Sequence, residues 1–101
     1  MTLDHMSTAT APHLGEVDLR LARVQQDRED QLQETPPNTA DPATTAYRGN
    51  LEATLREVRV ARERLASGDY GTCIRCAGTI AEERLDLRPW ALTCTPCARM
   101  V

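Results

Sequence analysis

Four cysteines in two close pairs constrain the fold of this chain more than any other feature of its sequence. Cys73 and Cys76 form the first pair, and Cys94 and Cys97 form the second, with residues 77–93 between them. Two residues inside each pair let the chain turn back, so that both sulfur atoms can reach one ion about 2.3 Å away. The spacing therefore predicts a single zinc ion bound by four thiolates.

A zinc ion with four thiolate ligands has a structural rather than a catalytic role. Its tetrahedral shell is full, whereas hydrolytic catalysis needs an open position for water or substrate. The sequence also offers no nucleophile beside a base and no phosphate-cradling loop. We therefore expect one structural Zn2+ and no enzymatic activity.

Disulfide bonds and a redox-active pair are the alternatives for these cysteines. Disulfides need an oxidising compartment, and a thioredoxin-like pair needs a strand-helix-strand setting that the sequence lacks. Residues 1–15 contain no basic start followed by an apolar stretch, and no segment is apolar enough to span a bilayer. The chain is therefore expected in the cytoplasm, away from membranes, with reduced thiols.

A chain of this composition is expected to need a metal or a partner to supplement its packing. It has 101 residues with no Phe, one Trp and two Tyr, and small domains with few large apolar side chains rarely fold by packing alone. The apolar residues between the cysteine pairs are expected to form a small core, namely Ile80, Leu85, Leu87, Trp90 and Leu92. Trp90 could instead contact a partner, but a domain with no other large side chain needs it inside.

Two helical segments before the cysteines predict an antiparallel coiled-coil hairpin. Their apolar residues recur three and four positions apart, which is the spacing of a helix that packs against another helix. The first seam comprises Leu14, Val17, Leu21 and Val24, and the second comprises Leu51, Leu55, Val58, Ala61 and Leu65. The first seam turns polar beyond Val24, so looser packing is expected there.

The ends of both helices are marked in the sequence. Pro36 and Pro37 stop the first helix near residue 34. Asp41 and Pro42 are a typical N-cap and first residue for the second helix, which Gly68 should end in the left-handed conformation.

The predicted fold is mainly α, with three parts along the chain. They are a flexible tail over residues 1–15, a helical hairpin over 16–68 with its tip loop near 35–41, and a zinc-knuckle domain over 69–101.

Residues 51–97 resemble the DksA/TraR four-cysteine zinc-finger family. The resemblance joins the segment Gly68-Asp69-Tyr70-Gly71, the pair Arg84-Leu85 followed by Pro89, and the cysteine pairs in one order. It implies a transcription regulator that binds RNA polymerase without sequence-specific DNA contacts. Family members insert the hairpin into the secondary channel of the polymerase, often together with the alarmone ppGpp.

The resemblance also points to particular residues at the hairpin tip and in the zinc domain. The family carries an Asp-x-x-Asp-x-Ala pattern at the tip, where Asp41 and Ala46 match but Thr44 replaces the second Asp. This departure implies weakened or altered activity. Arg88 falls where a basic residue of the family contacts the alarmone, and the alternative is an exposed arginine without a ligand.

Two other functions stay open at this point. The altered tip fits an adaptor whose coiled coil and zinc knuckle bind a different protein. Direct DNA binding could use basic residues of the second helix, namely Arg56, Arg59, Arg62 and Arg64. Glu52, Glu57 and Glu63 alternate with these arginines, and the net charge is −3, so a solvated helix face is the default interpretation.

Overall fold

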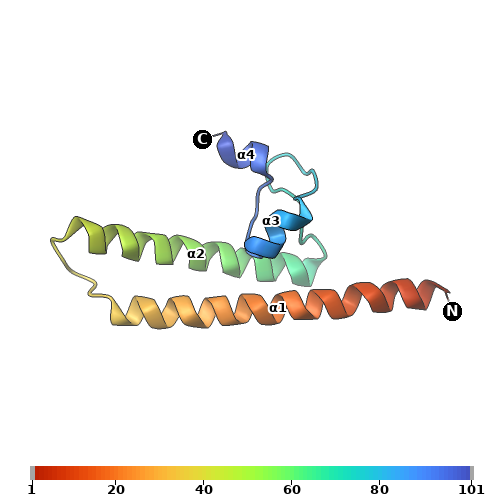
Figure 1. Ribbon diagram of the computed structural model, residues 1–101, viewed down its shortest axis with the longest axis horizontal. Helices are drawn as coiled ribbons and strands as arrows, with labels where there is room; N and C mark the ends of the chain where they lie inside the picture. The colour runs from red at the N-terminus through yellow and green to blue at the C-terminus, as the bar shows by residue number, and fades with distance from the viewer. Residues whose placement is uncertain (1, 101) are drawn as a thin grey trace.

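The computed structural model describes residues 2–100, and for residues 2–13 it describes the backbone alone. Two long helices, α1 (Thr2–Glu34) and α2 (Pro42–Ser67), lie side by side and run in opposite directions (Figure 1). Two short helices follow, α3 (Glu82–Leu87) and α4 (Thr95–Arg99). The molecule is elongated, at 61 × 30 × 21 Å. The predicted mainly helical fold, with a hairpin before the cysteine domain, is confirmed.

The first helix begins earlier than the sequence analysis predicts. α1 starts at Thr2, whereas a helix was expected from residue 16. The prediction relied on apolar periodicity, but a helix can continue past its packed section because its hydrogen bonds are local. The predicted tail, residues 1–15, falls largely outside the residues whose side chains are described.

The predicted caps of α2 are both present. Asp41 adopts an extended backbone conformation and accepts a hydrogen bond from the Ala43 amide, and Pro42 is the first helical residue. Gly68 ends the helix with a φ of 85°. The Gly68 and Asp69 amides donate to the Leu65 and Arg64 carbonyls at 3.3 and 2.8 Å. This closure turns the chain sharply toward the zinc-binding domain.

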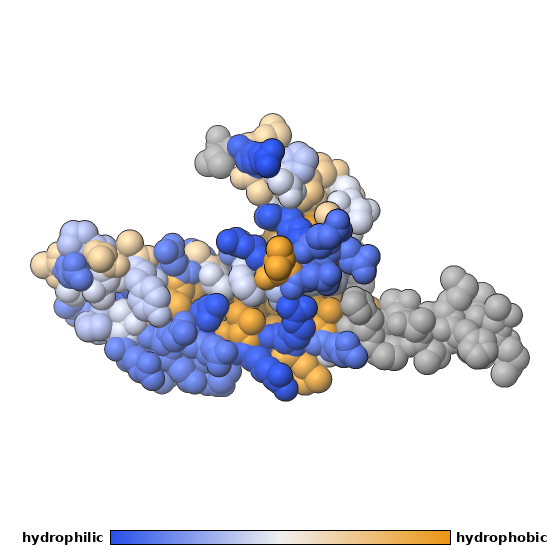
Figure 2. Space-filling model, viewed as in Figure 1, coloured by the Kyte–Doolittle hydropathy of each residue, from blue (hydrophilic) through white to orange (hydrophobic). Residues whose placement is uncertain are grey.

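The apolar seam forms one core at the end of the hairpin that carries the zinc domain. Val17 and Leu21 of α1 pack with Val58 and Ala61 of α2, and all four are buried. Partly buried side chains from both domains pack against this cluster, namely Val24, Leu65, Tyr70, Trp90 and Leu92. Figure 2 shows hydrophobic residues gathered at this junction, with hydrophilic residues over the neighbouring surface of the hairpin. The zinc domain and the hairpin therefore share a core.

Polar contacts join α1 and α2 both beside the apolar seam and beyond Val24. Arg62 donates to Asp18 at 3.0 Å through Nε and to Gln25 at 3.1 Å through Nη1. Arg59 and Glu29 form an ion pair at 3.4 Å. These side-chain hydrogen bonds join the two helices along the hairpin, and Leu51 and Leu55 of α2 are also buried. Among the described helices, none has an apolar stretch long enough to cross a membrane.

Gly49 is a weak point of α2 that a substitution should repair. It lies inside the helix, and a Cβ built there meets no atom within 4 Å. Alanine should therefore fit and raise the free energy of unfolding by about 0.5–1 kcal/mol, because glycine loses more backbone entropy on folding. Urea unfolding of zinc-loaded Gly49→Ala beside wild type measures this gain. A lower unfolding midpoint would show that the glycine has a structural role.

Candidate metal centre

The structure brings together the four cysteines that the sequence marks as ligands. All four Sγ atoms lie within 4.8 Å of one another, and Cys76 Sγ lies 3.7 Å from Cys94 Sγ. Zinc–sulfur bonds of about 2.3 Å in a tetrahedron require sulfur atoms about 3.8 Å apart. The sulfur cluster therefore has the size that one zinc ion needs, and its four soft donors suit that metal.

A tight backbone turn shapes the first cysteine pair. Cys73 donates its amide to the Gly78 carbonyl at 2.7 Å, and Ala77 donates to the Cys73 carbonyl at 3.0 Å. The amides of Arg75 and Gly78 point at the sulfur atoms of Cys73 and Cys76, each at 3.4 Å. Amide donors of this kind stabilise negative charge on sulfur, so the turn itself favours thiolate ligands.

The left-handed residue of this turn is Ala77 and not the neighbouring glycine. Ala77 has a φ of 63°, whereas Gly78 is outside the left-handed region. Gly78 is favoured for another reason, because a Cβ there would lie 3.2 Å from Cys76 Sγ, which is a tight contact. The turn therefore holds Ala77 in a strained conformation. It places Gly78 where the sulfur atom of Cys76 lies close to the backbone.

The second cysteine pair lies at the start of α4. Cys94 is the N-cap residue of this five-residue helix, and Pro96 lies in its first turn. Ala98 donates its amide to the Cys94 carbonyl at 2.9 Å. Helical geometry brings residues three apart onto one side, so Cys94 and Cys97 face the same ion.

The close approach of four sulfur atoms separates their pKa values. Burial opposes ionisation of Cys73, but hydrogen bonds from the backbone of Cys76, Cys94 and Arg75 lower its pKa to about 6. Hydrogen bonding with Cys94, together with burial, raises the pKa of Cys97 to about 12. Cys73 therefore loses its proton readily, whereas the neighbouring sulfur atoms oppose ionisation of Cys97. A bound dication offsets the repulsion between neighbouring thiolates, so that all four cysteines can be ionised together.

Hydrogen bonds attach the metal-binding segment to the hairpin. Within the finger, Tyr70 donates its hydroxyl to the Pro89 carbonyl at 2.8 Å. Arg64 of α2 donates to the Thr72 carbonyl at 3.0 Å, and Arg20 of α1 donates to the Asp86 carbonyl at 2.9 Å. The zinc centre is therefore held at a defined position against both long helices.

The core between the cysteine pairs matches the prediction in part. Ile80 is buried, and Trp90 and Leu92 pack against the hairpin core. Leu87 is 82% exposed, so its placement in the core was wrong. α3 ends at Leu87 and turns that side chain outward, while Pro89 and Ala91 fill the space instead. The sequence pattern alone does not show which side of a six-residue helix faces inward.

Comparison with known proteins agrees with this geometry. Residues 68–99 match the family model described as the prokaryotic dksA/traR C4-type zinc finger. This finger belongs to the DksA/TraR family. The family match and the cysteine cluster together show that the chain binds one structural zinc ion.

Two solved structures extend the similarity to the hairpin. DksA2 from Pseudomonas aeruginosa is 25% identical, with a TM-score of 0.68 over 90% of this chain and 84% of that one. A protein of Chlamydia trachomatis, described as the RNA polymerase binding protein and transcriptional regulator Dks, is 18% identical. Its TM-score is 0.70 over 90% of this chain and 88% of that one. The whole hairpin-plus-finger arrangement is therefore a DksA-like fold.

A curated relative is similar over a shorter stretch. An uncharacterised protein of Aquifex aeolicus (strain VF5) is 47% identical over 53 residues, which is 52% of this chain and 37% of that protein. The match thus spans little more than a third of the relative's length.

The tip residues named by the resemblance lie at the end of the hairpin opposite the start of the zinc finger (Figure 1). Asp41 and Ala46 are exposed and Thr44 is half-buried. The Thr44 hydroxyl donates to Asp41 Oδ2 at 2.7 Å. This bond, together with the Ala43 amide, lowers the pKa of Asp41. Asp41 is therefore an ionised carboxylate at the tip, and Thr44 is its hydrogen-bond partner rather than a second charge.

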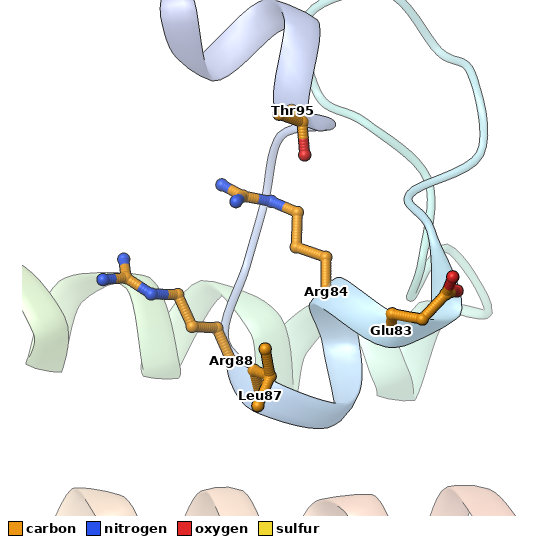
Figure 3. Close-up of a pocket in the computed structure, with 5 residues that line it drawn as sticks. All are labelled: Glu83, Arg84, Leu87, Arg88 and Thr95. Carbon is orange, nitrogen blue, oxygen red and sulfur yellow. The ribbon is translucent and has the colours of Figure 1, made fainter.

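Arg88 lies on the finger beside a second arginine that the sequence analysis did not single out as a site residue. Arg84 and Arg88 line a shallow pocket of about 270 Å³ with Glu83, Leu87 and Thr95 (Figure 3). Arg84 extends beneath Thr95, and Glu83 points away from both guanidinium groups. Arg84 could have been found from the sequence, because it lies four residues before Arg88. Residues four apart in a helical segment have side chains on one face.

The arginines considered for DNA binding are mostly engaged within the molecule. Arg59 and Arg62 pair with residues of α1, and Arg64 donates to the finger. Arg56 is exposed. These contacts give the basic residues of α2 a structural role along the hairpin.

Proposed function

We propose that this chain binds RNA polymerase and regulates transcription by inserting its hairpin into the secondary channel, without sequence-specific DNA contacts. The observation that carries the proposal is a long hairpin that shares a core with a zinc finger of the DksA/TraR family. α2 has 26 residues, which corresponds to about 39 Å of helix. In this proposal the probe acts without catalysing a reaction of its own, in the cytoplasm, where the polymerase is.

The tip chemistry supports this role in an altered form. Asp41 presents one ionised carboxylate, and the Thr44 hydroxyl is bonded to it. A tip with one negative charge should interact more weakly with a metal-containing active site than a tip with two. The proposed protein therefore occupies the channel and has a smaller effect on open complexes than a two-carboxylate tip would have.

The proposal includes ppGpp as a ligand of the complex with polymerase. Arg84 and Arg88 offer guanidinium groups on one side of the finger, and such groups bind phosphates well. Arg84 donates Nε to the Thr93 carbonyl at 2.9 Å, which leaves its terminal nitrogens for a ligand. Loss of ppGpp-dependent stimulation in Arg88→Ala, with zinc content unchanged, is the expected result.

Transcription in vitro with Thr44→Asp tests the role of the tip. The added carboxylate should shorten open-complex lifetime several-fold more than wild type does, because a second charge then faces the active site. Thr45→Asp is the matched control, since Thr45 is the exposed neighbour and places the same charge about 100° around the helix. Equal activity of the two variants would contradict a defined tip geometry.

Direct binding to RNA polymerase separates this function from the adaptor alternative, which the Thr44 substitution favours. Wild type should bind core polymerase at low salt and compete with another channel-binding factor. If wild type fails to bind the polymerase, the proposed function is wrong. Specific capture of one other protein, dependent on the tip residues, would then support the adaptor.

A further inference from the structure

The C-terminal end of α1 lacks the residues that usually close a helix. Its last turn contains no basic residue, and it ends at Glu34. The last four carbonyl groups of a helix have no partner inside it, and they carry the negative end of the helix dipole. Thr35 and two prolines follow, so a glycine cap is absent. This end therefore needs donors and positive charge from another part of the molecule.

Arg48, in the second turn of α2, supplies hydrogen-bond donors and a positive charge to this end of α1. Its Nη1 donates to the Leu32 carbonyl at 3.1 Å and to the Thr35 carbonyl at 2.9 Å. The side chain is half-buried, which shields these bonds from water. A charged donor to a carbonyl is stronger than a neutral one. Arg48 thus acts as a C-cap for α1 from the opposite helix.

Local bonds complete the closure on the α1 side. The Thr35 hydroxyl donates to the Gln31 carbonyl at 2.7 Å, and its amide donates to the Leu32 carbonyl at 3.2 Å. Beyond Thr35, one bond that the structure describes within the loop runs from the Asp41 amide to Thr39 Oγ1 at 3.1 Å. The path of the loop therefore depends strongly on the position in which Arg48 holds Thr35, the first residue of the loop.

We propose that Arg48 is a positioning residue for the hairpin tip. By joining the exit of α1 to the start of α2, it holds both ends of the tip loop, residues 35–41, in one arrangement. Asp41 is then presented to a partner in a single orientation. Binding loses less entropy when the contacting residues are already ordered. This inference rests on the proposed function, in which the tip acts on RNA polymerase.

Arg48→Ala tests the inference, with Arg56→Ala as the matched control. Arg56 lies on the same helix, is exposed, and makes no hydrogen bond to the residues that the structure describes. Backbone amide exchange by NMR is measured on the zinc-loaded free protein. Arg48→Ala should raise exchange about tenfold or more at the hydrogen-bonded amides of residues 32–35 and of Asp41, as expected for the loss of charge-assisted bonds. Exchange at Val58 should change less than about twofold, because Val58 lies in the distant core.

Polymerase binding and transcription are then measured for the same variants. Arg48→Ala should lower the effect on open-complex lifetime about fivefold or more while polymerase affinity changes less than about threefold, because the finger and the body of the hairpin are intact. Arg48→Lys should recover most of the effect, since one ammonium group can donate to both carbonyls. Arg56→Ala should match wild type in exchange, affinity and transcription.

The outcomes separate the two proposals. Unchanged exchange at the amides of residues 32–35 and of Asp41 in Arg48→Ala overturns the positioning role, whatever the polymerase data show. Faster exchange with an unchanged transcription effect overturns it too, because the orientation of the tip would then be irrelevant. A wild-type protein that does not bind polymerase refutes the proposed function, while the exchange result still decides whether Arg48 orders the loop.

Discussion

Chelation of the zinc ion is expected to unfold residues 69–99 and to loosen the hairpin with them. Four-thiolate sites contribute roughly 10–16 kcal/mol of apparent binding free energy that is coupled to folding. A whole small domain is stable by only about 5–15 kcal/mol. Trp90 is the one tryptophan of the chain and packs against the core cluster of the hairpin. Its fluorescence emission should therefore move to longer wavelength, and helical circular dichroism should fall.

Substitution of a single ligand should have the same result. Cys94→Ser leaves three thiolates and is expected to lower zinc affinity greatly, with Trp90 exposed at neutral pH. Thr95→Ser is the matched control, because Thr95 is the exposed neighbour of Cys94 and is not one of the four ligands. Less than one zinc ion per wild-type chain, or a Trp90 spectrum that chelation leaves unchanged, would refute the structural role of the metal.

Truncation of Leu21 should produce the largest loss of stability in the hairpin. Leu21 has no exposed surface and lies in the cluster formed with Val58 and Ala61. Leu21→Ala removes buried methyl groups and leaves a cavity, which costs about 2–5 kcal/mol. Urea unfolding of the zinc-loaded protein, followed by helical circular dichroism, measures the loss as a lower midpoint.

Leu19→Ala provides the control on the same helix. Leu19 is 65% exposed, so the same chemical change there should alter the free energy of unfolding by no more than about 0.5 kcal/mol. Comparable losses at Leu19 and Leu21 would show that the packing face of α1 is assigned incorrectly. A loss at Leu21 that also releases Trp90 would confirm that hairpin and finger share one core.

The features that the sequence predicts well depend on neighbouring residues. The caps of α2 are formed by Asp41 with Pro42 at its start and by Gly68 at its end. Asp41 and Gly68 bond to backbone groups only a few positions away. The cysteine pairs are similar, because two intervening residues are enough to form each ligand turn. The apolar spacing of α1 and α2 also identifies the packed face, since Val17, Leu21, Val58 and Ala61 are all buried.

The features that the sequence did not predict depend on residues far apart in the chain. The exposure of Leu87 follows from how α3 is seated on the hairpin, where Arg20 of α1 holds the Asp86 carbonyl. The closure of α1 by Arg48 joins residues from two helices. The left-handed conformation of Ala77 is an exception, because it belongs to a local turn over residues 73–78, and alanine has no preference for that conformation.

By itself the sequence determined the four-thiolate zinc site, the two packed helices and the caps of the second helix, because each follows from contacts between close neighbours. The tertiary structure decided how the finger is placed on the hairpin, which side of α3 faces outward and how the exit of α1 is closed. Those outcomes depend on side chains that meet only after the helices pair. Their physical cause is packing and hydrogen bonding between distant segments, which local patterns do not encode.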